Sequence, residues 1–146
     1  MKEARIYPSF PRVGVGAVVI KDGAILLVRR AAPPGEHLWA IPGGLLKLGE
    51  TLKEGAEREI KEETGITIIA GKPVFVFDFL EKDAQGQIIF HYVIIDLEGE
   101  YVTGTIQAAD DAADCRWIRP EECEHLPLTR STRKLLKEIK FIPEKT

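Results

Sequence analysis

Short apolar runs separated by polar turns recur along the chain, and this pattern predicts β-strands. The first two runs cover 13–20 and 24–29, and Lys21-Asp22-Gly23 lies between them. Asp-Gly between two apolar runs is a hairpin signal, so we expect these strands to pair. The polar, small-residue-rich segment 99–113 indicates a loop with some extended structure. Further strands are expected at 38–41, 66–69, 74–80, 88–97 and 115–118.

Helical periodicity is clearest between Thr51 and Gly65. Glu54 follows Thr51 by three residues, as in a capping box, and Gly65 is typical of the position just past a helix end. Another helix should begin at Pro120, and an amphipathic helix should cover 128–141. Strands interrupted by one central and one terminal helix indicate an α/β fold, in which helices pack on the faces of a mixed β-sheet.

Length and charge narrow the class of protein. A chain of 146 residues has the size of one domain, and we expect a single domain over 1–146. The net charge of −3 argues against binding to nucleic acid or to an anionic membrane, because both attract positively charged proteins. No apolar run reaches the roughly 20 residues that span a bilayer, and no signal-peptide core is present, so we expect a cytoplasmic protein. Cys115 and Cys123 lack the spacing of a zinc site or redox motif, which indicates structural thiols.

The central helix carries three carboxylates close to its end, Glu59, Glu62 and Glu63. Each helical residue advances by about 100° around the axis, so their directions follow from the sequence. Glu59 and Glu63 fall inside the apolar stripe, while Glu62 falls on its shoulder. The apolar stripe itself is formed by Leu52, Ala56 and Ile60. Two acids are therefore expected to point toward the protein interior.

An inward carboxylate is costly unless a positive group compensates it. Arg58 is the nearest cation, and one guanidinium cannot neutralise three carboxylates. A divalent cation such as Mg²⁺ prefers oxygen ligands and is held by few carboxylates when it also binds a phosphate substrate. A solvated acidic helix face is the alternative. The Gly43-Gly44 pair and Glu50 near the start of the helix favour the metal, because glycines let the backbone approach a ligand closely.

The segment from Gly44 to Ile66 reads GLLKLGETLKEGAEREIKEETGI. It satisfies every fixed position of the pattern G-x5-E-x7-R-E-U-x-E-E-x-G-U, where U is a bulky aliphatic residue. This segment resembles the Nudix box, and the chain is similar to Nudix hydrolases. The resemblance implies a Nudix fold, an α/β/α sandwich with a mixed β-sheet in which the box forms a loop, a helix and a loop. It also implies hydrolysis of a nucleoside diphosphate linked to another moiety, with Mg²⁺ or Mn²⁺.

The resemblance also implies roles for individual residues. The implied metal ligands are Glu59 and Glu63, Glu62 as a further ligand, and the carbonyl of Gly43. Glu62 is alternatively the general base, and it stands with Glu63, Arg58 and Glu50 in the implied catalytic set. Arg58 and Glu50 would hold the box together by an ion pair, which is a structural rather than a substrate-binding role.

The general base could also come from a later loop. Splitting a pyrophosphate requires neutralised phosphoryl charge and a water oriented in line with the leaving oxygen. Asp110, Asp111 and Asp114 precede the strand that contains Trp117. Our hypothesis is that one of these acids faces the metal ions, and the alternative is that all three are ordinary loop residues.

Substrate contacts are less specific in the sequence. Arg29 and Arg30 close the first hairpin and could meet phosphate, because guanidinium groups match phosphate oxygens; the alternative is a solvated strand end. His91 and Tyr92 point to opposite faces of their strand, so one of them could line the substrate pocket, and the alternative is placement in the core. Asp111 is a further candidate for substrate binding.

The leading substrate is ADP-ribose or a related nucleoside diphosphate sugar. The run 90–97 followed by 110–117 is similar to small members of the family grouped with ADP-ribose pyrophosphatases, although Glu81 and Lys82 stand where that branch often has a proline. A nucleoside triphosphate pyrophosphohydrolase is the alternative enzyme. A Nudix domain that senses a nucleotide without cleaving it is the alternative from another class. Relatives are commonly homodimers, so a homodimer is one expected assembly.

Overall fold

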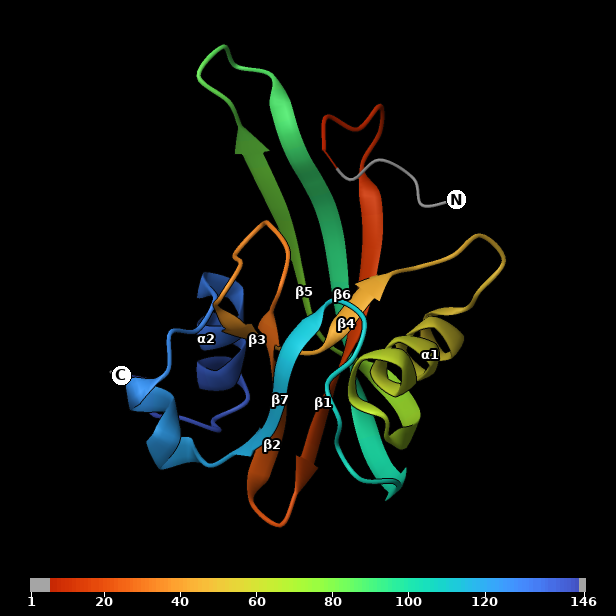
Figure 1. Cartoon of the computed structure of the whole chain (residues 1–146), viewed down its shortest axis with the longest axis vertical. Coiled ribbons are helices and arrows are strands. Elements are labelled where there is room, and N and C mark those ends of the chain that lie inside the picture. The colour runs from red at the N-terminus through yellow and green to blue at the C-terminus, as the bar shows by residue number, and fades with distance from the viewer. Residues whose placement is uncertain (1–5, 145–146) are drawn as a thin grey trace.

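The computed structural model describes residues 6–144 as strands and helices arranged around the long strand β1 (Figure 1). The predicted hairpin is present as β1 and β2, and the predicted central helix is α1. The elements in chain order are β1 (Arg12–Lys21), β2 (Ala24–Arg30), β3 (Trp39–Ala40), β4 (Gly43–Leu45), α1 (Leu52–Thr64), β5 (Thr67–Lys82), β6 (Ile88–Thr103), β7 (Ala112–Ile118), the 3₁₀ helix η1 (Pro120–His125) and α2 (Arg130–Glu138). No helix in residues 6–144 is long and apolar enough to cross a bilayer.

The sheet is mixed, as the sequence predicted. The strand order is β3-β2-β1-β6-β5, with β4 also paired to β1 and β7 also paired to β2. β1 runs parallel to β6 and antiparallel to β2 and β4. The parallel pair brings a late strand beside the first one, so residues far apart in the sequence meet near the middle of the sheet.

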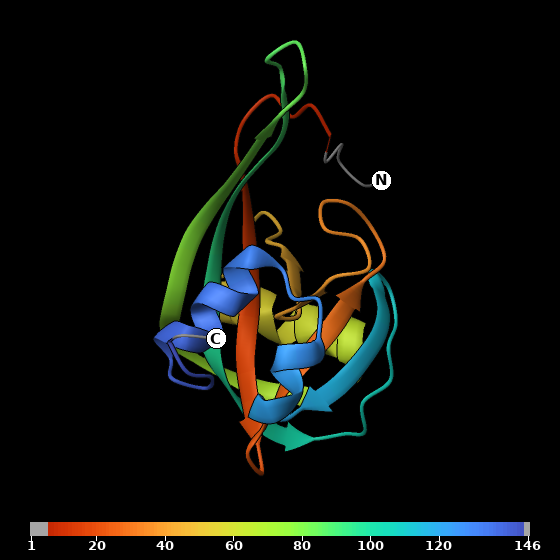
Figure 2. The same ribbon diagram turned by 90° about the vertical axis from the view of Figure 1, so that its left-hand side faces the viewer.

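The two α-helices cover opposite faces of this sheet, as the views in Figures 1 and 2 show. On one face, Ala56 of α1 packs in a cluster with Val15 of β1. On the other face, Leu135 and Leu136 of α2 pack in a cluster with Val18. Because alternate residues of a strand point to opposite faces, one strand serves both layers. The α/β/α sandwich expected from the sequence is therefore present.

Several predicted boundaries were wrong. The strands expected at 66–69 and 74–80 form one strand, β5, whose pairing with β6 is irregular on both sides of Pro73. The expected loop 99–113 begins later, because β6 continues to Thr103 and makes a long hairpin with β5. Long cross-strand pairing overrides the local preference of small polar residues for loops.

Two further differences concern the segments around the expected site. Gly43–Leu45 is a strand, β4, where the sequence predicted none, and pairing with β1 supplies what the local sequence lacks. The last helix is shorter than 128–141 and starts after Thr129, whose hydroxyl accepts a hydrogen bond from the Thr132 amide at 3.2 Å. Thr129 therefore acts as an N-cap, a signal that the apolar periodicity alone does not reveal.

Candidate active site

Helix α1 presents its acids as the rotation around its axis predicted. Thr51 and Glu54 form the capping box that starts the helix, and Gly65 ends it in a left-handed conformation. Glu59 and Glu63 are buried, with exposed fractions of 7% and 5%, although the same helix exposes Glu62 to solvent. Burial raises the pKa of Glu63 to about 8, against the opposing effect of a hydrogen bond from the Gly43 amide. Both buried acids therefore lie where a cation would stabilise their charged form.

Burial also raises the pKa of Glu59, while the nearby charge of Arg58 acts in the opposite direction. The Arg58 Nη1 atom lies 3.6 Å from Glu59 Oε1. This distance is too long for a hydrogen bond, so the guanidinium compensates Glu59 only in part. Helix α1 consequently buries more carboxyl groups than its own arginine compensates.

Arg58 is mainly engaged with the loop that precedes α1. Its Nε lies 2.5 Å from Glu50 Oε2, and its Nη2 donates to Glu50 Oε1 at 2.9 Å and to the Leu45 carbonyl at 3.1 Å. Its Nη1 donates to Glu62 Oε2 at 3.1 Å. The hydrogen bonds from Arg58 lower the pKa of Glu50. Arg58 and Glu50 thus fix the loop against α1, which is the arrangement that the resemblance implied for them.

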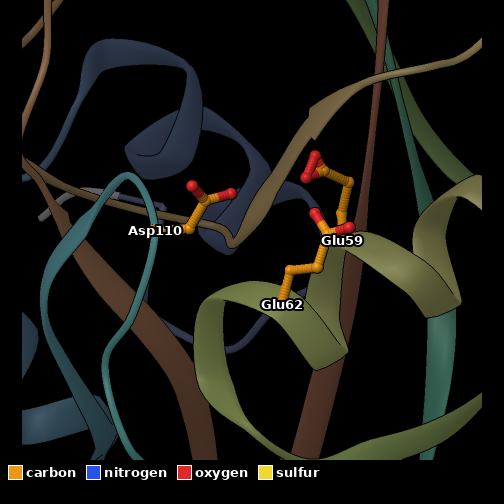
Figure 3. Close-up of side chains that lie close together, drawn as sticks. All are labelled: Glu59, Glu62 and Asp110. Carbon is orange, nitrogen blue, oxygen red and sulfur yellow. The ribbon is translucent and has the colours of Figure 1, made fainter.

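An aspartate from a distant part of the chain lies close to two glutamates of α1. One carboxylate oxygen from each of Glu59, Glu62 and Asp110 lies within 4.8 Å of the others. Figure 3 shows Asp110 entering from the loop before β7, while both glutamates project from α1. All three offer carboxylate oxygens, the donors preferred by Mg²⁺ and Mn²⁺. With the uncompensated buried carboxyl groups of α1, this donor set fits a hard divalent cation.

The glycine pair before α1 allows the backbone to reach the buried acids. The Gly43 amide donates to Glu63 Oε1 at 2.9 Å. A Cβ atom at Gly44 would overlap the carboxylate group of Glu59. Position 44 therefore has to be glycine for Glu59 to keep its place. In the structure Gly43 contacts Glu63 through its amide. The role of the Gly43 carbonyl as a metal ligand stays a prediction.

The three late aspartates have different surroundings. Asp110 belongs to the acidic cluster, and Asp111 lines a cavity next to Glu63. Asp114 is paired with Arg116 at 3.0 Å and also accepts a hydrogen bond from the Cys115 amide at 2.7 Å. Asp110 is therefore the aspartate best placed to meet a metal ion beside the box.

A cavity of about 690 Å³ opens beside the acids, between the strands and the start of α2. This volume lies within the usual range for small-molecule sites, about 300–1,000 Å³. Arg30 lines the cavity and its Nε donates to the Pro34 carbonyl at 2.7 Å, which orients the guanidinium. Arg29 and His91 are not among the described residues that line it, whereas Tyr92 is. Of the pair His91 and Tyr92, the tyrosine is thus the one that faces the cavity.

Asp96 lines the same cavity, and the sequence did not predict it as a site residue. Asp96 is 4% exposed, and burial raises the pKa of its carboxyl group to about 7. The available signal was a single acid inside the apolar run 93–97 of a strand. Phe77 and Phe79 also line the cavity.

Comparisons with known proteins agree with this geometry. Residues 10–139 match the family model described as the NUDIX domain. The chain is 35% identical over 118 residues to an ADP-ribose pyrophosphatase of Methanocaldococcus jannaschii, a match that covers 81% of this chain and 67% of that protein. Among solved structures, a MutT NUDIX hydrolase from Burkholderia pseudomallei aligns with a TM-score of 0.77 at 29% identity, covering 90% of this chain and 99% of that one. The NUDIX domain of Shewanella oneidensis NrtR complexed with ADP ribose aligns with a TM-score of 0.70 at 21% identity, over 90% and 88% of the two chains, which concerns the fold alone.

Proposed function

Because the chain belongs to the Nudix hydrolase family, we propose that it is a metal-dependent pyrophosphohydrolase that cleaves ADP-ribose or a related nucleoside diphosphate sugar. The observation that carries this proposal is the presence on α1 of two buried, incompletely compensated carboxyl groups, Glu59 and Glu63, of which Glu63 lines a nucleotide-sized cavity. The similarity to a protein named as an ADP-ribose pyrophosphatase supports the choice of substrate.

Glu59, Glu62 and Glu63 would hold the divalent cation, together with Asp110 from the opposite loop. When bound, Mg²⁺ or Mn²⁺ neutralises phosphoryl charge and makes a bound water more acidic. The remaining positive charge at the site comes from the chain itself. Arg30 lies at the cavity with a fixed guanidinium, which suits it to a phosphate oxygen of the substrate.

The proton of the attacking water needs an acceptor. Glu62 is exposed to solvent and lies close to Asp110, so either carboxylate could take that proton and pass it to bulk water. Arg58 would hold Glu62 by a hydrogen bond of 3.1 Å while it anchors the preceding loop through Glu50. We therefore propose Arg58 and Glu50 as positioning residues rather than substrate ligands.

The test is a substrate screen on the purified protein. ADP-ribose, a nucleoside diphosphate sugar and nucleoside triphosphates would be incubated with Mg²⁺, with Mn²⁺ and with excess chelator. The proposal expects AMP and ribose 5-phosphate from ADP-ribose, only when metal is present. Exclusive release of pyrophosphate from triphosphates would favour the alternative enzyme, and tight nucleotide binding without turnover would favour a sensor.

Variants at the acids test the site itself. Glu59→Gln and Glu63→Gln should each lower kcat/KM by at least about 10²–10³-fold, the usual cost of losing one preorganised electrostatic contact. Glu138→Gln on the exposed surface of α2 is the matched control and should keep full activity. Normal turnover by either active-site variant would contradict the assignment.

A further inference from the structure

A further buried acid lines the same cavity as Glu63. Asp96 is on β6, is 4% exposed and lines the cavity. Within residues 6–144 the structure shows no hydrogen bond or ion pair to its carboxyl group, and desolvation is the one cause of its raised pKa. Among residues 6–144, no side-chain oxygen that is fully shielded from solvent lacks a hydrogen-bond partner. The unpaired oxygens of Asp96 therefore reach the cavity, where a bound molecule can supply the partner that the protein does not.

The neighbouring backbone leaves room for this carboxyl group. Gly16 of β1 is paired with Asp96 on one side and with Gly43 on the other. A Cβ atom at Gly16 would lie 2.7 Å from Asp96 Oδ1 and 2.6 Å from the Pro42 carbonyl oxygen. A side chain at position 16 would therefore displace the carboxyl group or close the adjacent part of the cavity.

The strand side of the cavity also carries aromatic rings. Phe77 and Phe79 of β5 and Tyr92 of β6 all line it. Aromatic side chains supply flat apolar surfaces on which a planar ring can stack. Together with Asp96, they form a subsite of apolar walls with one hydrogen-bonding group.

The chemistry of the substrate decides which of its parts fits this subsite. Its phosphates require the cation near Glu63 and the guanidinium of Arg30, and they would be repelled by another carboxylate. The Asp96 subsite is instead suited to an uncharged planar group that carries N–H donors. A nucleobase has this chemistry, because every base has a flat face and a polar edge.

We propose that Asp96 is the residue by which this protein discriminates among nucleobases, through hydrogen bonds between its carboxyl group and the polar edge of the base. This inference rests on the proposed function, because it assumes that the cavity binds a nucleotide. It extends that function by assigning base selection to a side chain that lies outside the Nudix box.

The experiment compares Asp96→Asn with the wild type on nucleoside diphosphate sugars that differ only in the base. Asparagine keeps the size of the side chain but replaces an oxygen with an NH₂ donor. The ratio of kcat/KM between the best base and the others should change by about tenfold or more, since a mismatched polar edge leaves groups unpaired. Asp22→Asn is the control for the same substitution, because Asp22 is exposed in the turn between β1 and β2 and is not among the described residues that line the cavity, so the base preference should not change.

Two outcomes would overturn the inference. One is an equal change in kcat/KM for every base, which a merely structural residue would produce. The other is a change confined to the ratio between ribose and 2′-deoxyribose substrates, which would assign Asp96 to the sugar. Mn²⁺ affinity should be the same in Asp96→Asn and the wild type.

A binding measurement on the wild-type protein tests the inference without a variant and without substrate turnover. Calorimetry on the wild-type protein would compare AMP with purine riboside monophosphate, which lacks the exocyclic amine of adenine, and would repeat the comparison for guanine and cytosine nucleotides. Base discrimination of about tenfold or more is expected for at least one pair, and equal affinities throughout would overturn the inference. Absence of metal-dependent hydrolysis with base discrimination intact would instead contradict the proposed function alone.

Discussion

Replacing Asp96 by asparagine is expected to make the protein more stable at neutral and alkaline pH. The Asp96 carboxyl group is buried, and burial raises its pKa from the ordinary 3.8 to about 7. The folded state therefore holds the proton more tightly than the unfolded state does. Stability that is present below about pH 4 is consequently lost as the pH rises to about 7. Asparagine does not ionise and escapes this loss.

The size of the effect follows from the two pKa values. Their difference corresponds to about 4 kcal/mol, at about 1.36 kcal/mol for a tenfold change in proton affinity. The variant should therefore exceed the wild type by about 4 kcal/mol in free energy of unfolding at pH 8, and by less than about 1 kcal/mol at pH 4. Such a difference is a large fraction of the stability of a small domain.

The assay is urea unfolding followed by tryptophan fluorescence, with Trp39 buried in the core as one reporter. Wild type and Asp96→Asn would be measured in chelator at intervals from pH 4 to pH 8. Other titrating groups, including Glu63, are common to both proteins, so the difference between the two curves isolates Asp96. A difference in free energy of unfolding between the two proteins that stays constant from pH 4 to pH 8 would refute the reasoning. It would show that the pKa of Asp96 is the same in the folded and unfolded states.

Three other predictions concern the Nudix box. Arg58→Lys should lose about 2–3 kcal/mol of unfolding free energy in denaturant titrations, because lysine cannot reproduce the paired hydrogen bonds to Glu50; unchanged stability would contradict this. Gly44→Ala should lower kcat/KM by at least about tenfold in steady-state assays, because its Cβ must displace Glu59, and full activity would argue against the required position of that acid. Asp110→Ala should weaken Mn²⁺ binding in calorimetry by about 10–100-fold, whereas an unchanged affinity would remove Asp110 from the metal site.

The sequence was sufficient to predict the parts of the site that lie on a single helix or hairpin. Helical rotation placed Glu59 and Glu63 inside and Glu62 on the shoulder of the apolar stripe, because the period of an α-helix is fixed and Thr51 and Gly65 define its ends. The hairpin β1–β2 followed from its Asp-Gly turn in the same way.

Features that depend on contacts between distant segments of the chain could not be predicted from the sequence. The approach of Asp110 to α1 depends on where the loop before β7 runs, and several late aspartates were equivalent in the sequence. Asp96 became a cavity residue only because β6 pairs in parallel with β1 and brings it beside Gly16. No local pattern specifies such a register between strands so far apart along the chain.

The central claim is that the inward acids of α1 exist to hold a divalent cation that binds the diphosphate of the substrate. Its most direct test is anomalous diffraction from crystals soaked in Mn²⁺. The account predicts a peak bounded by the carboxylates of Glu59 and Glu63. Soaked crystals without that peak, from protein that hydrolyses its substrate unimpaired in excess chelator, would contradict it.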